Sequence, residues 1–196
     1  MTSRTAVLLS AVVLAAAGRW LPHLDNFAPM TAMAVFAAAR LNDRRLALLA
    51  PLVALGVSDV GLEVLHRIDP DRWPNCWSSW VPVVGVRGVC FNILGVYLGT
   101  LAAGLLGLLA RRRSLAVAAG SLLSGSVVFF LVSNFACWVA SYPHTLAGLT
   151  TCYELALPFY RNSLLGDCVY GVILFGGLAL AEARFPALRQ AEPSPA

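Results

Sequence analysis

Charge is scarce in this chain, and lysine is absent altogether. Of 196 residues, 12% are charged and 59% are hydrophobic, and all 14 basic residues are arginine. Soluble domains carry about 25% charged residues, so the composition excludes an ordinary soluble fold and leaves no room for a soluble domain beside an apolar one. Lipid does not hydrate charges, and a chain built for lipid has few of them. We therefore predict an all-α, polytopic membrane protein.

The usual signatures of enzymes and metal sites are missing as well. The sequence has no Gly-rich phosphate loop, no HExxH and no CxxC or HxxxH spacing, so zinc and nucleotide chemistry are weakly supported. The five cysteines are an odd number and cannot all pair within the chain. Cys90, Cys137 and Cys168 lie in or beside apolar segments, where a small packing role is ordinary.

Apolar segments predict six membrane helices in a single domain over residues 1–185, followed by a flexible tail over 186–196. Their approximate bounds are Thr5–Leu21, Ala28–Ala39, Leu46–Leu65, Val83–Ala110, Leu115–Ala140 and Ser163–Ala183. The second is short for a hydrocarbon layer of about 30 Å. The first also has the features of a signal peptide; we favour a membrane helix because further spans follow it.

The arginines predict the orientation of these helices. They gather in two knots, Arg40/Arg44/Arg45 and 111–113, and near the termini at Arg4, Arg184 and Arg189. With six spans all these positions share one side, which the positive-inside rule makes cytoplasmic. A basic balance can also indicate nucleic acid, but these arginines sit in short loops between apolar segments. We predict membrane lipid, and no nucleic acid, as the surroundings of the chain.

Polar residues on the opposite side form three clusters. In one of them, Asp59, Glu63 and His66 are spaced i, i+4, i+7 and share a helical face. Asp59 falls within an apolar run, and an ionisable group there is a hypothesis for a functional site. The structural alternative is an ion pair with Arg87 or Arg161.

A second cluster is the turn over 21–29, which holds two prolines together with His23 and Asn26. Proline fixes φ, so the turn is stiff and would hold both polar side chains in place. Such a turn suits ligand contact, and it equally suits a plain reversal between two helices.

Three tryptophans, Trp73, Trp77 and Trp80, surround Cys76 in the loop after the third apolar segment. They fit an interfacial aromatic belt or flat walls for a large ring-bearing ligand. Cys76 fits a disulfide with Cys152 in an oxidising periplasm, or a thiolate ligand to a soft metal centre. The sequence leaves both pairs of alternatives open.

The last cluster is an amphipathic, aromatic-rich segment over Ser141–Asn162, which includes Tyr142 and Arg161. Irregular backbone near lipid must be covered by protein or line a cavity, so we interpret this segment as a candidate lid over the outer mouth. Asp167, at the start of the last apolar segment, is a candidate buried acid like Asp59.

Several spaced motifs within residues 18 to 177 occur in an order that resembles a known family. They are Leu-Pro-His-x-x-Asn-Phe-x-Pro at 21–29, Ser58-Asp59, Ser133-Asn134-Phe135 with Trp138, Tyr142-Pro143, Gly148-Leu149, Cys152-Tyr153, Pro158-Phe159-Tyr160 and Gly166-Asp167. This pattern is similar to the substrate-binding (S) components of energy-coupling-factor vitamin transporters. With Cys76 on the outer side, the chain looks most like the solitary vitamin B12 transporters of the BtuM type.

The resemblance implies a six-helix bundle in the bacterial inner membrane that takes up cobalamin through an outward-facing pocket. Cys76 would ligate cobalt and could slowly displace cyanide from cyanocobalamin. The other residues implied as ligand contacts are His23, Asn26, Asp59, Trp77, Trp80, Tyr142 and Arg161. Small residues of the first helix, Ala11 and Ala15, would dock an energy-coupling module, although internal packing explains them equally well.

Two other functions remain open from the residues. The same fold could bind another vitamin or a metal ion. Alternatively, Cys76 and Cys152 could form the dithiol pair of a membrane redox protein.

Overall fold

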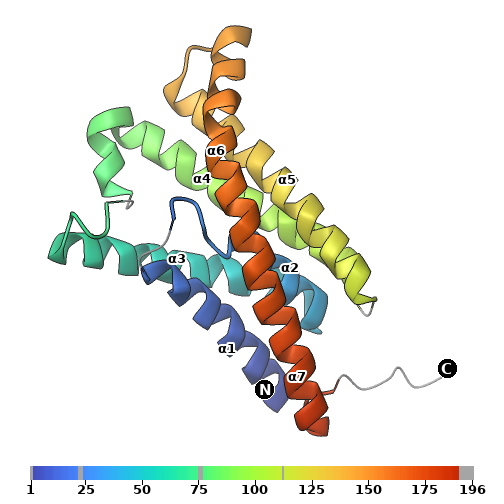
Figure 1. Ribbon diagram of the computed structural model, residues 1–196. Coiled ribbons are helices and arrows are strands. Elements are labelled where there is room, and N and C mark those ends of the chain that lie inside the picture. Colours follow the sequence, from blue (N-terminus) through green and yellow to red (C-terminus); the bar gives the residue numbers. More distant parts are fainter. Residues whose placement is uncertain (1, 22–23, 75–76, 112, 190–196) are drawn as a thin grey trace.

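The computed structural model describes residues 2–21, 24–74, 77–111 and 113–189, and within these ranges it is all-helical, without a strand (Figure 1). Four helices are long and apolar enough to cross a membrane: α3 (Arg44–Ile68), the helix Ser78–Ala110 that contains α4 (Val81–Gly107), α5 (Leu115–Ser141) and the helix Leu146–Arg184. The predicted all-α membrane class is therefore confirmed. Of the six predicted spans, four correspond to helices that are long and apolar enough to cross a membrane.

The two helices at the N-terminal end are not among these four, and both lie close to their predicted bounds. α1 (Ser3–Ala17) has 15 residues and is extended only by the 3-10 turn η1 (Gly18–Trp20). α2 (Met30–Arg40) has 11 residues, about 16 Å at 1.5 Å per residue. That length is about half of a hydrocarbon layer of about 30 Å. α2 is buried on every side from Thr31 to Ala39, so it is a half-length helix enclosed by the others.

Local sequence explains where three of the long helices begin. Asp43, Ser114 and Thr145 are N-cap residues of α3, α5 and α6, and each side chain accepts a hydrogen bond from a backbone N–H three residues further on. The distances are 2.9 Å from Leu46 N, 3.4 Å from Val117 N and 3.1 Å from Gly148 N. These side chains satisfy backbone donors that the first helical turn leaves free.

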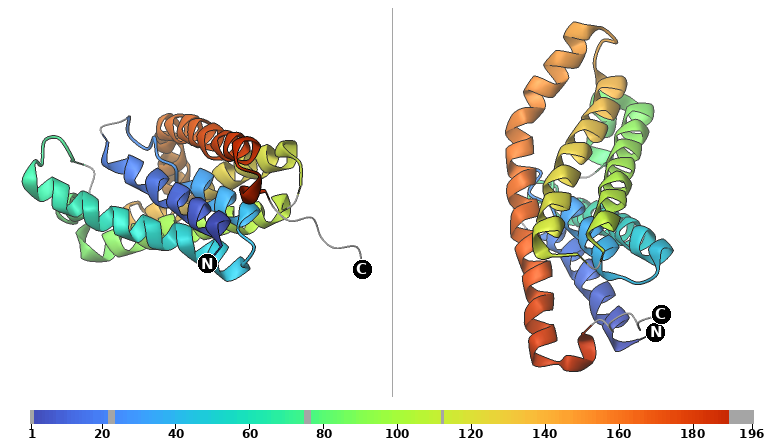
Figure 2. Two further views of the ribbon diagram at one scale, coloured as in Figure 1. Left: turned by 90° about the horizontal axis from the view of Figure 1, so that it is seen from below. Right: turned by 90° about the vertical axis from the view of Figure 1, so that its right-hand side faces the viewer.

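The irregular lid predicted over Ser141–Asn162 is replaced by helix. α6 (Leu146–Gly171) begins directly after the turn at Tyr142–Thr145 and continues through the π-helical turn η4 (Val172–Gly176) into α7 (Gly177–Arg184). The Thr145 cap starts this helix, and Pro158 lies inside it. α6 and α7 thus form the long helix that runs along the whole molecule in Figures 1 and 2.

α4 and α5 are antiparallel neighbours that approach closely through glycines. A Cβ on Gly95 would lie 2.4 Å from Ala136 Cβ, and one on Gly99 would lie 2.9 Å from the Phe129 ring. Small residues allow this kind of contact between membrane helices, where packing rather than water drives association. Near its start α4 bends at Gly85, whose φ is 70° and ψ is 168°.

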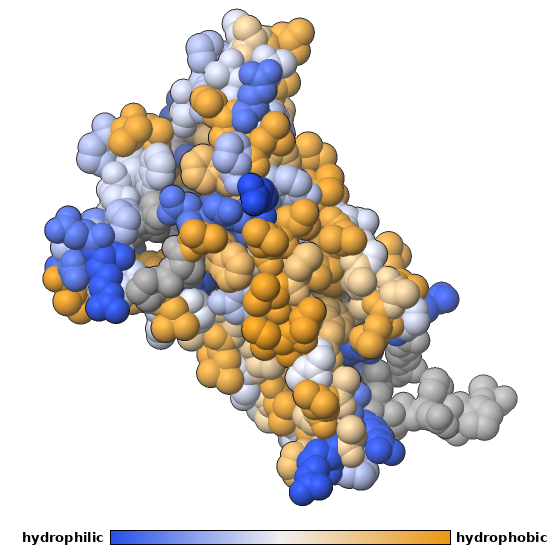
Figure 3. Space-filling view, viewed as in Figure 1, coloured by the Kyte–Doolittle hydropathy of each residue, from blue (hydrophilic) through white to orange (hydrophobic). Residues whose placement is uncertain are grey.

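The two ends of the described chain meet. Arg4 Nη1 in α1 lies 2.5 Å from Glu182 Oε1 in α7, and it also donates to the Leu188 carbonyl in the 3-10 turn η5 (Pro186–Leu188). Arg40 lies over the Phe175 ring at 5.3 Å, and Arg111 donates to the Asn42 carbonyl at 2.5 Å. Arginines from both knots therefore gather at the end of the bundle where α1 begins. Figure 3 shows mainly hydrophobic side chains over the lower half of the visible face, hydrophilic ones at its lower end, and a further hydrophilic group across its upper half.

Candidate functional site

Asp59 lies in an ion pair that joins three helical elements. It is 8% exposed on α3, and its Oδ1 lies 2.7 Å from Arg19 Nη1 in η1. Its Oδ2 accepts a hydrogen bond of 3.0 Å from the Tyr97 hydroxyl in α4. Arg19 also donates to Ser58 Oγ. A carboxylate within apolar helices is stable when paired and hydrogen-bonded in this way.

The partner of Asp59 corrects a sequence-based expectation. Arg87 and Arg161 were the alternatives considered, but Arg87 lies over the Phe91 ring at 5.8 Å and Arg161 is exposed on α6. Arg19 is the partner because η1 brings it directly against α3. The signal in the sequence was its position, because Arg19 lies at the end of the first apolar segment and apart from the two arginine knots.

Glycines on α3 allow this contact. A Cβ on Gly61 would lie 2.5 Å from the Trp20 ring, and one on Gly56 would lie 3.1 Å from the Tyr97 hydroxyl. Because Gly61 has no side chain, the indole of Trp20 lies against the helix and donates from Nε1 to the Ser58 carbonyl at 3.0 Å. The end of α1 is thereby fixed to α3.

The loop after α3 folds back onto the same place. Trp73 Nε1 donates to the Trp20 carbonyl at 2.9 Å, and His66 Nδ1 lies 2.8 Å from the Trp73 carbonyl. Further along, Glu63 Oε1 accepts from Ser78 N at 2.8 Å. We call Arg19, Trp20, Asp59, Glu63, His66 and Trp73 the α3 cluster. Asp59, Glu63 and His66, which helical spacing places on one face of α3, each contact a different neighbouring segment.

The predicted site residues do not all gather at the α3 cluster. Trp77 is the N-cap residue of the 3-10 turn η2 (Ser78–Trp80) and Trp80 is its last residue; Glu63 anchors this turn. Tyr142 lies in the turn between α5 and α6, a different part of the molecule from the end of α3 in Figure 1. Burial raises the pKa of the Tyr142 hydroxyl, so it is a protonated donor at neutral pH. His23 and Cys76 lie outside the described residues.

The stiff turn before α2 packs against α6. Asn26 is exposed with a φ of 60°, and Asn162 Nδ2 of α6 donates to the Asp25 carbonyl at 3.0 Å. A Cβ on Gly166 would lie 3.0 Å from the Ala28 backbone nitrogen, so glycine is needed for this close approach. Arg161 neighbours Asn162 on α6, so Asn26 and Arg161 lie on segments that this hydrogen bond joins.

Cys152 is a buried free thiol in α6. Its Sγ donates to the Asn134 carbonyl at 3.5 Å, and the Cys137 thiol of α5 lies beside it. A Cys76–Cys152 disulfide stays a prediction, because Cys76 lies outside the described residues. Within the described residues, no group of three or more His, Cys, Asp or Glu side chains could hold a metal ion.

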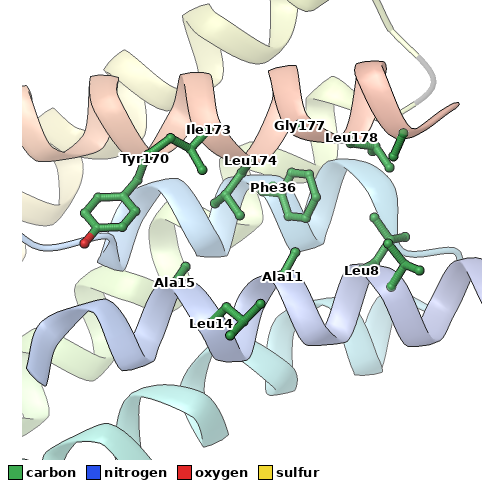
Figure 4. Close-up of a pocket in the computed structure, with 12 residues that line it drawn as sticks. Leu8, Ala11, Leu14, Ala15, Phe36, Tyr170, Ile173, Leu174, Gly177 and Leu178 are labelled. Atoms are coloured by element: carbon green, nitrogen blue, oxygen red, sulfur yellow. The ribbon is translucent and has the colours of Figure 1, made fainter. Parts of the chain in front are cut away.

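Two cavities in the described chain are apolar and lie away from the α3 cluster. One, of about 280 Å³, lies between α1 and the α6–α7 helix, with Phe36 of α2 and both Ala11 and Ala15 on its walls (Figure 4). The other, of about 200 Å³, lies between α4 and α5 around Gly95. Neither is lined by a residue predicted to contact a ligand. Ala15 also belongs to the buried core, in agreement with the internal-packing interpretation of these alanines.

The fold and its buried ion pair define a helical membrane protein of the polytopic class. Residues 1–188 match a family described as a family of unknown function (DUF6580), and the chain belongs to it. No curated protein and no solved structure matches the chain.

Proposed function

We propose that this protein is a vitamin-uptake protein of the bacterial inner membrane that binds cobalamin at the end of the bundle opposite the arginines. The proposed bundle crosses the membrane six times, with α1–η1 and α2 completing the four long helices and both termini in the cytoplasm. The resemblance of the motifs to S components supports this proposal.

The observation that carries the proposal is how the chain is held on either side of Cys76. Before it, Trp73 is hydrogen-bonded to Trp20 and His66; after it, Ser78 is hydrogen-bonded to Glu63. Both anchors belong to the α3 cluster. A short segment with fixed ends is suited to presenting a ligand atom with little loss of conformational entropy.

The chemistry of the proposed site follows from its residue types. A thiolate is a soft ligand suited to a soft metal centre, and indole rings offer flat apolar walls to a corrin. Trp77, Trp80, Asp59, His23, Asn26, Tyr142 and Arg161 would supply the walls and polar contacts. If the thiolate replaces cyanide on cobalt, a Co–S bond forms and cyanide leaves with its electron pair, so the cobalt keeps its oxidation state.

A spectroscopic binding experiment tests this proposal. The purified full-length protein is incubated with cyanocobalamin or hydroxocobalamin and separated by gel filtration, and the protein fraction is examined for corrin absorption. We expect a retained corrin band whose position differs from that of the free compound, because the axial ligand has changed. Cys90→Ala, a change on an exposed face of α4, is the matched control and should keep the band.

The outcomes separate the parts of the proposal. If Cys76→Ala leaves both band position and affinity unchanged, Cys76 is not the cobalt ligand. If no corrin is retained by the unaltered protein, cobalamin is not the ligand, and native mass spectrometry of the protein as isolated would identify another vitamin or a metal ion. Counting free thiols with and without reductant tests the redox alternative, which requires a stable Cys76–Cys152 bridge.

ATP use, if any, would come from a partner. The proposed contact of an energy-coupling module is the small-residue face of α1 at Ala11, which is only partly buried, whereas Ala15 beside it belongs to the core; small residues permit close approach of another helix. Copurification of such a module with the intact chain, and its loss with Ala11→Leu, would support this part.

A further inference from the structure

A second buried carboxylate lies in the centre of the bundle, apart from the α3 cluster. Asp167 of α6 is 3% exposed, and its Oδ1 accepts a hydrogen bond of 3.1 Å from the backbone amide of Ala32 in α2. Ala32 precedes Arg40 by eight residues, or about 12 Å along α2. Asp167 therefore lies well inside the apolar layer, where an ionised group is costly unless its charge is compensated.

The protein groups around Asp167 would compensate only part of the charge of its ionised carboxylate. Pro29, the N-cap residue of α2, offers no side-chain cap, and Asp167 takes that place at the positive end of the helix. A helix terminus carries about half of an elementary charge. Among the described residues, the salt bridges join Arg4 to Glu182 and Arg19 to Asp59, and no charged side chain acts on Asp167. An ionised Asp167 would therefore leave a negative charge within the bundle.

The side chains around this carboxylate supply oxygen atoms. Thr31 of α2 and Ser126 of α5 face it closely enough to stabilise its charge, and both residues are 1% exposed. Ser126 Oγ is fully buried, yet it has no hydrogen bond of normal geometry within the described part of the chain. Buried hydroxyls are almost always hydrogen-bonded, so a hydroxyl that faces a carboxylate without a hydrogen bond of normal geometry is placed to share a ligand with it.

The backbone explains why three elements meet here. A Cβ on Gly125, which precedes Ser126, would lie 3.0 Å from Thr31 Cγ2, so glycine allows α5 to pack directly on the first turn of α2. Gly166, which precedes Asp167, allows the segment before α2 to pack on α6. Both polar residues are thereby placed at the start of a half-length helix. Broken helices of this kind hold the coupling ions of many membrane transporters near the membrane midplane.

We propose that Asp167, Ser126 and Thr31 form an intramembrane site for a small monovalent cation, either a sodium ion or a proton. A carboxylate and two hydroxyls are hard oxygen ligands suited to sodium. A proton on the carboxylate would neutralise the same charge and could be shared with Ser126. The site is independent of Cys76 and of the ligand proposed for the α3 cluster.

The test measures the melting temperature of the purified full-length protein without cobalamin. Sodium chloride is raised from about 1 to about 100 mM, with choline chloride keeping the ionic strength constant, at several pH values between 6 and 8. A ligand that binds only the folded state raises the melting temperature; we expect a rise of about 5 °C if the highest concentration is about a hundredfold above the dissociation constant.

The two cations give different results. If sodium is the ligand, the melting temperature rises with sodium but not with choline. If a proton is the ligand, sodium has no effect, and the melting temperature falls as pH rises through the pKa of the folded state, because the bound proton is lost. In either case Asp167→Asn should abolish the dependence, while the isosteric amide can still accept the hydrogen bond from Ala32.

Two further variants keep the test decisive. Ser126→Ala removes one hydroxyl and should move the sodium midpoint about tenfold upward or weaken the pH dependence. Glu154→Gln, an exposed acid on the same helix, is the matched control and should respond as the unaltered protein does, as should Cys76→Ala. The proposal is overturned if the unaltered protein is insensitive to sodium and shows the same pH dependence as Asp167→Asn, since Asp167 would then only cap α2.

Discussion

Two carboxylates lie inside the helical bundle, and different groups offset their charges. Asp59 has a guanidinium at 2.7 Å and a tyrosine hydroxyl at 3.0 Å. Asp167 has a backbone amide and neighbouring hydroxyls. A buried ion pair is destabilised when either partner is removed, because the other charge is then left unpaired. A carboxylate beside hydroxyls can instead bind and release a cation or a proton. The first arrangement is suited to holding structure and the second to responding to the solution.

At the residue scale, the Arg19–Asp59 pair gives the first prediction. Removing one partner leaves an unpaired charge in an apolar setting, which costs about 3–5 kcal/mol in buried pairs. We expect Arg19→Met and Asp59→Asn each to lower the melting temperature strongly. The double variant should recover part of the loss, because no charge remains unpaired. Strictly additive effects in a double-mutant cycle would show that the two side chains do not interact.

Gly61 gives a second prediction at this scale. A Cβ there would lie 2.5 Å from the Trp20 ring, so Gly61→Ala must displace the indole and lose its hydrogen bond to Ser58. We expect a destabilisation of about 1–3 kcal/mol and a change in tryptophan fluorescence. Gly120→Ala, with open space around the new Cβ, should be neutral or slightly stabilising. Equal effects of the two changes would contradict the packing described here.

At the element scale, α4 owes its bend to one glycine. Gly85 has φ 70° and ψ 168°, a conformation that is essentially restricted to glycine. We expect Gly85→Ala to cost about 1–3 kcal/mol through backbone strain alone, since nothing lies within 4 Å of the new Cβ. Thermal unfolding measures the loss, with Gly176→Ala as the control in helical backbone. A stability unchanged from that of the control would mean that α4 can straighten without cost.

Hydropathy predicts most of these elements, and the failures have physical causes. The segment 141–162 is amphipathic and rich in aromatic residues, and it was interpreted as an irregular lid. Pro143 lies in the turn before the Thr145 cap, and α6 accommodates Pro158 within its length. Conversely, Ala28–Ala39 has the composition of a lipid-facing helix, yet α2 is enclosed by protein on all sides. Composition alone does not distinguish lipid from an apolar protein interior.

The candidate site was predictable in part. The spacing of Asp59, Glu63 and His66 on α3 indicated one polar face, because helical periodicity is local. The partner Arg19 is 40 residues from Asp59 along the chain, and their contact depends on how η1 meets α3. Tyr97 was missed for the same reason, since its hydroxyl reaches Asp59 only through the packing of α4. Long-range contacts of this kind depend on tertiary structure rather than local pattern.

At the scale of the whole molecule, the arginine-rich end and the turn between α5 and α6 should lie on opposite sides of the membrane. In a cysteine-free background, His144→Cys in that turn should react with a membrane-impermeant maleimide added to intact cells. Asn42→Cys, beside the first arginine knot, should react only after permeabilisation. Both positions are exposed, so access to solvent is matched. Labelling of both, or the reverse order, would overturn the proposed orientation.

The contact between Arg4 and Glu182 has a consequence for biosynthesis. α1 packs against α7, which follows it much later in the chain, through an ion pair between residues 178 positions apart. The flank of α1 that contacts α7 therefore stays uncovered during synthesis until α7 has been made. Since contacts between distant segments form late and slowly, this flank is where quality-control proteases and insertion chaperones would distinguish an unfinished chain from a finished one.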